Sequence, residues 1–327
     1  MPSRDARSGR DLDRRRDRRR SGRGAVAALV VAVVAIVVGV VVVVVGSHSS
    51  TPPARASAPS TSASAGDTAV AWGADQLRRF DAATALIASK KGHIGIVVED
   101  RQTGLIWRGG EPNTLIWAGS TPKLAFALAL REWARSRGTA LDANTNTQIA
   151  AMLAVSDNHA ADTLWNRYAT SDPAAWMTRF HGFGMTTATY VDTFPKRWGF
   201  VKCSAQDLVG LMDYILTKAD PTDRAYLVNA MRTVGDIQHW GVWGAGSSLQ
   251  PGVKDGWSVE KDAGKDHWIT ATVGFAGPNE RYSIGAMYHQ LPGGDTIDEG
   301  VHTLTDLVAT VFGAPVPAPA VVPPADT

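Results

Sequence analysis

The pattern of apolar and polar positions divides the chain into an apolar run, two polar segments and a long amphipathic region. Residues 25–45 form an uninterrupted apolar run of 21 residues. At about 1.5 Å per residue this run spans the roughly 30 Å hydrocarbon core of a bilayer, and in lipid only a helix pairs every backbone group within one segment. We therefore expect one transmembrane helix there. The Ser, Thr, Pro and Ala of 46–66 predict a flexible stalk, and the Pro and Ala of 314–327 predict a disordered tail.

Between these segments, residues 67–313 have the patterning of one folded domain. Apolar residues recur at helical spacing in 77–87 and 297–311, whereas 94–100 with 105–108, and 268–276 with 282–289, alternate like paired strands. Helical patterns occupy 120–137, 147–168 and a segment opened by the capping box of Ser204 and Asp207. Strands at both ends with helices between them predict an α+β fold, in which the terminal helices cover a mainly antiparallel sheet.

Charge and composition narrow the function classes. The formal net charge is +2, but residues 1–24 hold ten Arg against four Asp, a net of +6, so the remainder carries 2 − 6 = −4. A folded part without excess positive charge does not favour nucleic-acid binding. By the positive-inside rule the Arg-rich 1–24 stays in the cytoplasm and everything after Gly46 lies outside, which predicts a single-pass protein of the cell membrane. The alternative is a secreted protein, since the Ala-Arg-Ala of 54–56 is an acceptable signal-peptide cleavage site.

Cysteine and histidine usage predicts no metal and no cofactor. Cys203 is the single cysteine of the sequence, which excludes an intramolecular disulfide framework and a Cys-rich metal site. The eight histidines show no ligand spacing such as His-x-x-x-His with a nearby Glu. The oligomeric state stays open.

The first candidate chemistry is Ser120-Thr121-Pro122-Lys123. A hydroxyl and an amine three residues apart lie on one face of a helix, and Pro122 favours a helix start because proline is tolerated in a first turn. A serine at such a start lies beside unpaired N–H groups that can stabilise an oxyanion. Lys123 can act as a base only if burial or another cation lowers its pKa.

Two further motifs follow in order. Ser156-Asp157-Asn158 begins 36 residues after Ser120, and Lys254-Asp255-Gly256 begins 98 residues after Ser156. The ordered set resembles the penicillin-recognising serine enzymes, meaning class A β-lactamases and the related DD-peptidases, over about residues 70–312. This resemblance implies a five-stranded, mainly antiparallel sheet flanked by terminal helices, with an additional all-helical subdomain.

The resemblance also implies catalytic roles. Ser120 would be the nucleophile that forms an acyl-enzyme, Lys123 its activating base, and Ser156 the relay that passes a proton to the leaving nitrogen. Asn158 would hold the amide side chain of the substrate and help to orient Lys123. Asp157 would be structural.

The third motif would bind the substrate. Lys254 would supply positive charge on the edge strand, and Gly256 would let the substrate backbone lie alongside that strand. The backbone N–H groups of Ser120 and Trp257 would form the oxyanion hole. The substrate implied is a β-lactam or a peptidoglycan-like amide.

Two departures from the family pattern affect the expected chemistry. The family carries a deacylating glutamate after its second motif, but no Glu occurs between Glu132 and Glu260, and the matching stretch 187–203 offers only Asp192 as a carboxylate. Because a positioned base commonly contributes about 10² to 10⁴ in rate, we expect slow deacylation. The second departure is Asp255, where the family has a hydroxyl; we expect it to repel a substrate carboxylate and to pair with Lys254.

Two functions from different classes remain. The first is a membrane-anchored, extracytoplasmic serine hydrolase or acyltransferase of the β-lactamase or DD-peptidase type. The alternative is a catalytically attenuated cell-wall or ligand-binding module on the same fold.

Overall fold

The computed structural model describes residues 71–262, 265–292 and 296–325. The predicted cytoplasmic segment, transmembrane helix and stalk lie outside the described residues. Within them, none of the helices has both the length and the apolar character needed to cross a bilayer.

A five-stranded sheet forms the centre of the fold. Its order is β2-β1-β8-β7-β6, and every neighbouring pair is antiparallel. The strands are β1 (Gly92–Asp100), β2 (Leu105–Gly110), β6 (Gly252–Asp262), β7 (Lys265–Ala276) and β8 (Tyr282–Gln290). Both predicted strand pairs are confirmed, and β6 extends the sheet as the edge strand beyond β7.

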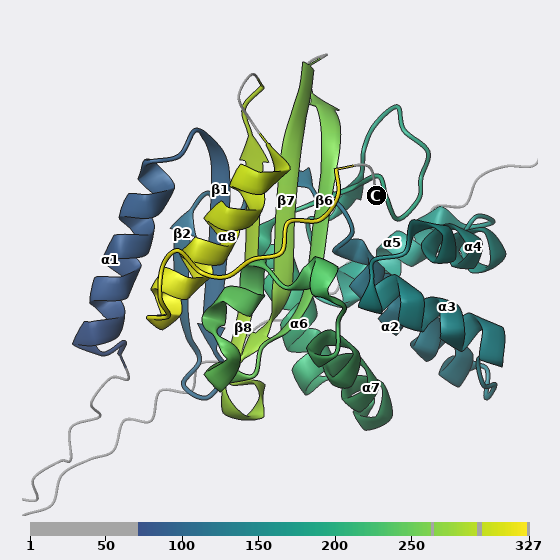
Figure 1. Ribbon diagram of the computed structural model, residues 1–327. Coiled ribbons are helices and arrows are strands. Elements are labelled where there is room, and N and C mark those ends of the chain that lie inside the picture. The colour runs from purple at the N-terminus through teal and green to yellow at the C-terminus, as the bar shows by residue number, and fades with distance from the viewer. Residues whose placement is uncertain (1–70, 263–264, 293–295, 326–327) are drawn as a thin grey trace, which may run out of the picture. The chain divides into compact units, whose positions relative to one another are not determined.

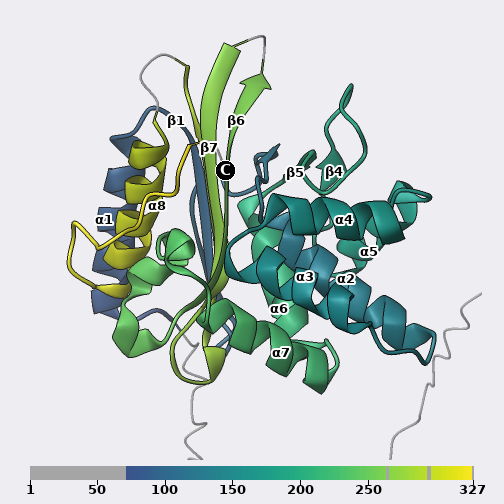
Figure 2. The ribbon, with the colours of Figure 1, turned by 45° about the vertical axis from the view of Figure 1, so that its right-hand side comes forward.

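The two terminal helices cover one face of this sheet. Helices α1 (Ala74–Ala88) and α8 (Ile297–Phe312) pack against each other there, as Figure 1 and Figure 2 show. Helix α6 (Ala205–Thr217) packs against β8 from the opposite face, and its predicted capping box is present. The approach is close because β8 carries Gly285, where an added Cβ would lie 2.8 Å from the Ala205 carbonyl oxygen.

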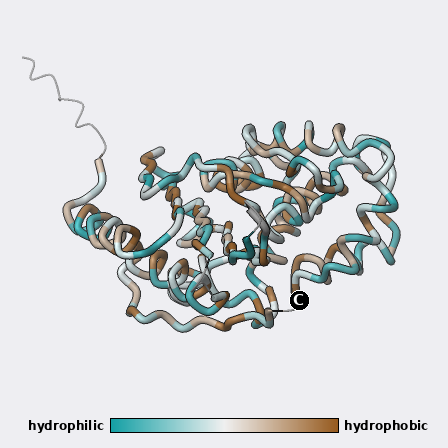
Figure 3. Tube along the Cα trace, turned by 90° about the horizontal axis from the view of Figure 1, so that it is seen from above, coloured by the Kyte–Doolittle hydropathy of each residue, from teal (hydrophilic) through white to brown (hydrophobic). Residues whose placement is uncertain are grey.

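An all-helical subdomain extends from the α6 side of the sheet. It contains α2 (Pro122–Ser136), α3 (Ala143–Ala154), α4 (Asn158–Tyr168), α5 (Pro173–Gly182) and α7 (Pro221–Arg232). Side-chain oxygens of aspartates accept hydrogen bonds at the first turns of four of these helices, namely Asp142, Asp157, Asp172 and Asp220. Apolar and polar residues are interspersed along these helices (Figure 3), and each helix has apolar residues among its buried ones.

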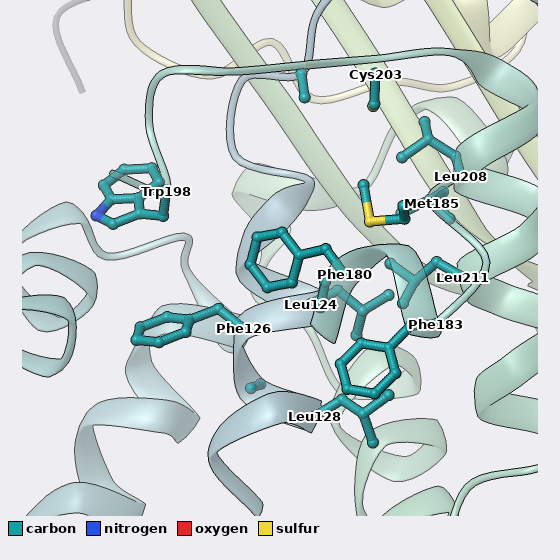
Figure 4. Close-up of a cluster of buried hydrophobic side chains, with 14 of the residues drawn as sticks. Leu124, Phe126, Leu128, Phe180, Phe183, Met185, Trp198, Cys203, Leu208 and Leu211 are labelled. Atoms are coloured by element: carbon teal, nitrogen blue, oxygen red, sulfur yellow. The ribbon is translucent and has the colours of Figure 1, made fainter. Parts of the chain in front are cut away.

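Helix α2 is the centre of that subdomain. Its residues from Pro122 to Leu130 are all buried, and Leu124 and Leu128 lie among Phe180, Phe183 and other apolar side chains (Figure 4). A helix that is apolar on every side must be enclosed by other elements. The helix that carries Lys123 is therefore held rigidly by the core.

Three features differ from the sequence predictions. The helical pattern of 147–168 breaks at Ser156, which has a φ of 61° and separates α3 from α4. Short strands β3 (Ile116–Trp117), β4 (Thr189–Tyr190) and β5 (Val201–Cys203) form a second sheet in the order β3-β5-β4. A 3₁₀ turn, η1 (Asp236–Gln238), lies ahead of β6.

The tail after α8 is a fourth difference and corrects the expectation of disorder. In the described part of 314–327, Ala318 is buried, and its backbone N–H donates to Asp306 Oδ1 at 2.7 Å. Val321 N–H donates to the His239 carbonyl oxygen at 3.1 Å, and Val322 packs against the α8 side of the core. The few valines and alanines between the prolines are sufficient to hold this segment on the domain.

Candidate active site

Ser120 lies immediately before α2, in the turn that connects it to β3. The helix begins at Pro122 with Thr121 as its N-cap, so Ser120 precedes the first turn rather than opening it. Lys123 N–H donates to the Ser120 carbonyl oxygen at 3.2 Å, which keeps the two residues one turn apart as predicted. Ser120 is 8% exposed and lines a cavity.

Lys123 is a fully buried amine with oxygen partners on two sides. Its Nζ donates to the Ser156 carbonyl oxygen at 2.5 Å and to Asn158 Oδ1 at 2.7 Å. Ser156 Oγ lies 3.3 Å from the same nitrogen, and the Trp198 ring centroid lies 4.3 Å away. Burial, with the neighbouring Lys254 as the second cause, lowers the pKa of Lys123 to about 6. At neutral pH the amine is therefore mostly uncharged, and its lone pair is available to accept a hydroxyl proton.

Ser156 links two lysines. Its Oγ lies 3.3 Å from Lys123 Nζ and 3.1 Å from Lys254 Nζ. The left-handed backbone of Ser156, which a non-glycine residue adopts at some cost, turns both its carbonyl oxygen and its hydroxyl toward Lys123. A hydroxyl between two amines can pass a proton from one side to the other.

Lys254 lies on strand β6, and its Nζ donates hydrogen bonds to three oxygen atoms. Its Nζ donates to Gln238 Oε1 at 2.6 Å, to the Asp255 carbonyl oxygen at 2.6 Å and to Ser156 Oγ at 3.1 Å. Burial lowers the pKa of Lys254 to about 7. The structure thus brings together Ser120, Lys123, Ser156, Asn158 and Lys254 from three separate segments of the chain, as the motifs predicted.

Gln238 is a site residue that the sequence analysis missed. It is fully buried in η1, and its Nε2 donates to the carbonyl oxygens of Leu153 at 2.6 Å and Ala154 at 2.8 Å. Its Oε1 accepts from Lys254 Nζ and, at 3.1 Å, from Asp255 N–H. One amide therefore connects the end of α3, just before Ser156, to the strand of the third motif. No local pattern marks this glutamine, because all of its partners are distant in the sequence.

Asp255 does not act as the sequence predicted. Successive side chains on a strand point to opposite faces, so Asp255 points away from Lys254, toward the face where Val253 and Trp257 pack in the α8 core. It is 0% exposed, opposes Thr272 in the β7 register and does not line the cavity. Burial raises the pKa of Asp255 well above its ordinary value, which favours the uncharged acid. Lys254 contacts its backbone oxygen rather than its carboxyl group.

Gly256 is required for a different reason from the one expected. A Cβ at Gly256 would lie 2.5 Å from Ser120 N and 2.7 Å from the Ala118 carbonyl oxygen, so the close approach is to the backbone around Ser120. Gly119, with a φ of 53°, faces the strand in the same way, since its Cβ would lie 2.7 Å from Trp257 N. The backbone nitrogens of Ser120 and Trp257, predicted to form an oxyanion hole, are thereby brought to one place beside the Ser120 side chain.

We expect Gly256→Ala to lower the rate of Ser120 acylation by up to about 10²-fold. The added Cβ meets backbone atoms, which cannot rotate away, and a displacement on the order of 1 Å at a reacting group can cost that factor. The rate of adduct formation by intact-mass spectrometry is the measurement. Gly182→Ala is the control, because nothing lies within 4 Å of a Cβ at that position; equal rates in both variants would contradict the packing argument.

The cavity beside Ser120 has a volume of about 720 Å³. Its walls come from the Ser120 turn, the Ser156 motif, segment 194–200, η1 and the outer half of β6. The lining residues are Gly119, Ser120, Val155, Ser156, Asp157, Asn158, Phe194, Arg197, Trp198, Gly199, Phe200, Ile237, Trp257, Ser258, Val259 and Glu260. The buried Lys123 and Lys254 are not among these lining residues, and both contact Ser156, which is one of them.

Segment 187–203 places no carboxylate in the cavity. Asp192, the only carboxylate of this stretch, is exposed and does not line the cavity, so it does not take the place of the missing glutamate. Trp198 lies there instead, with its ring over Lys123 Nζ and its Nε1 donating to Asp162 Oδ1 at 2.8 Å. The carboxylates that do line the cavity are Asp157, which caps α4, and Glu260, which accepts a hydrogen bond from the Ser258 hydroxyl.

The pH dependence of acylation follows from the two lysines. Neutral Lys123 is the active form, so the rate is expected to rise with pH through about 6 and then to level off. Lys254→Met removes the neighbouring charge that lowers the pKa of Lys123, so this rising limb is expected to move to higher pH. Acylation rates measured from about pH 5 to 9 test both statements. If the acylation rate rises over the same pH range in the parent protein and in Lys254→Met, Lys254 does not influence the pKa of Lys123.

Comparisons with known proteins agree with this arrangement at the level of fold. The sequence matches no protein-family model and no curated protein. Solved structures that resemble it include a variant of the class A β-lactamase of the last common ancestor of Gram-negative bacteria, at 16% identity and a TM-score of 0.58 over 74% of this chain and 98% of that one. A β-lactamase from Chitinophaga pinensis matches at 16% identity and 0.57, over 71% and 98%. PBP-A matches at 16% identity and 0.58, over 72% and 95%. The chain therefore has the fold of the class A β-lactamases and PBP-A, which confirms the fold that its three motifs implied.

Proposed function

We propose that this protein is an extracytoplasmic serine hydrolase or acyltransferase that forms an acyl-enzyme on Ser120. The single observation that carries the proposal is the buried, largely uncharged Lys123, one helical turn after Ser120 and bridged through the Ser156 hydroxyl to Lys254. The fold of class A β-lactamases and PBP-A supports it. Burying two amines away from water costs free energy, and a binding module without catalytic activity would gain nothing from them.

The geometry supports an ordered sequence of proton transfers. Ser120 Oγ attacks the carbonyl carbon while its proton passes to the lone pair of Lys123. The oxyanion develops beside the backbone nitrogens of Ser120 and Trp257. When the C–N bond breaks, the leaving nitrogen takes the hydroxyl proton of Ser156, which is replaced from the protonated Lys123. Asn158 and Gln238 keep the two lysines in position throughout.

Hydrolysis of the acyl-enzyme is proposed to be slow. Removal of the acyl group needs a water molecule and a base, and among the residues of 187–203 the indole of Trp198, rather than a carboxylate, lies against Lys123. Transfer to an amine acceptor would give a faster exit if the acceptor nitrogen entered the place of the leaving group.

The substrate and location that we propose follow the fold and the sequence. The amide cleaved would be a β-lactam or a cell-wall peptide bond. The apolar run 25–45 would anchor the chain in the cell membrane, with the domain outside.

Intact-mass spectrometry of the full-length protein in detergent, incubated with penicillin and cephalosporin probes, tests the proposal. We expect an adduct of one probe mass that persists for longer than the reagent takes to react, and no adduct in Ser120→Ala. An adduct that decays with hydrolysis of the drug would show efficient deacylation. Absence of any Ser120-dependent adduct would favour the alternative binding module.

A further inference from the structure

Three large apolar side chains that the fold leaves exposed stand at the mouth of the Ser120 cavity. Val155 is 49% exposed, Phe194 39% and Val259 45%. They come from the end of α3, from the segment between β4 and β5, and from the edge strand β6. Single exposed apolar residues are ordinary on a protein surface, but a group around one opening is typical of a binding site.

The apolar rim is continuous with rigid walls inside. Phe194 packs edge-on against Trp117, with 5.1 Å between their ring centroids, and its ring centroid lies 5.0 Å from that of Phe200. Trp257 packs against the buried Trp240 at 6.2 Å. Because these rings are fixed by their neighbours, the cavity offers a preformed apolar surface. Its volume of about 720 Å³ lies within the range of about 300 to 1,000 Å³ that is usual for small-molecule sites.

The charged groups of the lining do not favour a carboxylate. Asp157 and Glu260 are both acidic. The basic residue among the lining residues is Arg197, whose guanidinium is paired with Asp162 at 3.0 Å. Lys254 is fully buried and contacts the cavity wall through the hydroxyl of Ser156.

We propose that Ser120 prefers substrates with an extended apolar acyl group, which lies between Val155, Phe194 and Val259. This inference rests on the proposed function and narrows it to acyl groups that carry no charge at the end that reaches the rim. Each buried methylene contributes about 0.8 kcal/mol, or about fourfold in kcat/KM when the contact is made in the transition state. An acyl chain long enough to reach the rim buries several methylenes, and each of them raises kcat/KM by this factor.

p-Nitrophenyl esters of increasing chain length test the inference with the full-length protein in detergent. In this reaction the Ser120 Oγ–carbonyl bond forms as the bond to p-nitrophenolate breaks, the Ser120 proton passes to Lys123, and water later releases the acid. The burst of p-nitrophenolate reports acylation even where hydrolysis is slow. From acetate to octanoate we expect kcat/KM, taken from the burst, to rise at least tenfold. The adipate monoester should react at least tenfold more slowly than the hexanoate ester of the same length.

Variants at the rim separate this inference from the proposed function. Val259→Asp should remove the preference for octanoate, measured as the ratio of its kcat/KM to that of acetate. Ile106→Asp is the matched control, because Ile106 is an exposed aliphatic residue, 37% exposed, on β2 at the opposite edge of the sheet. Ser120-dependent acetate turnover without a chain-length preference would overturn the inference alone. No Ser120-dependent burst with any ester, and no adduct with the β-lactam probes, would overturn both.

Discussion

Lys123→Met is expected to lower the rate of Ser120 acylation by about 10² to 10⁴-fold, the contribution of a positioned general base. Methionine has a similar length and fills the buried site, but it has no lone pair that can accept the Ser120 proton at neutral pH. The loss should appear in the rate of adduct formation followed by intact mass. The substitution also removes a buried amine that is costly to desolvate, so the melting temperature is not expected to fall in parallel with the rate.

The control for this variant is Lys90→Met, which removes a surface lysine whose Nζ lies 3.6 Å from Glu299. It should acylate at the rate of the parent protein. Acylation of Lys123→Met at more than about a tenth of the parent rate would show that another group activates Ser120.

Gln238→Leu is expected to reduce both stability and acylation. Leucine keeps the volume but leaves the Leu153 carbonyl oxygen without this donor, and the Asp255 N–H and Lys254 Nζ each without one acceptor. The Ala154 carbonyl oxygen keeps the Gly235 N–H as a donor. Each buried polar group left unpaired costs about 1 to 3 kcal/mol, so we expect the free energy of unfolding to fall by at least about 2 kcal/mol in denaturant titrations. Acylation should fall by about tenfold or more, because the Ser156 turn and β6 lose the amide that joins them.

A pH profile distinguishes a positioning role of Gln238 from a structural one. Loss of the Oε1 acceptor destabilises the charged form of Lys254, which weakens the influence of that charge on Lys123. The rising limb of the acylation rate should therefore move to higher pH in Gln238→Leu, the direction also expected for Lys254→Met. Gln290→Leu is the matched control, because Gln290 is equally buried and its amide bonds both backbone groups of Thr296, away from the site. If both variants lose stability and neither moves the limb, Gln238 is only structural.

Local features of the sequence predicted most of the regular structure correctly. Period-two alternation found β7 and β8, helical spacing found α1 and α8, and the capping box of Ser204 and Asp207 opens α6 as expected. These signals work because they depend on neighbours within a few residues. The strands β3, β4 and β5 were missed because elements of two or three residues are too short to show a period.

The sequence by itself identified the candidate site. The order and spacing of the three motifs predicted that Ser120, Lys123, Ser156 and Lys254 meet, and the structure brings them together. Only the tertiary structure decided the surroundings of these groups. Gln238 reaches Leu153 across 85 residues, and Trp198 reaches Lys123 from a segment without a helical or strand pattern. Such partners, and the burial that lowers the pKa of both lysines, arise from packing between segments distant in the chain, which no local pattern encodes.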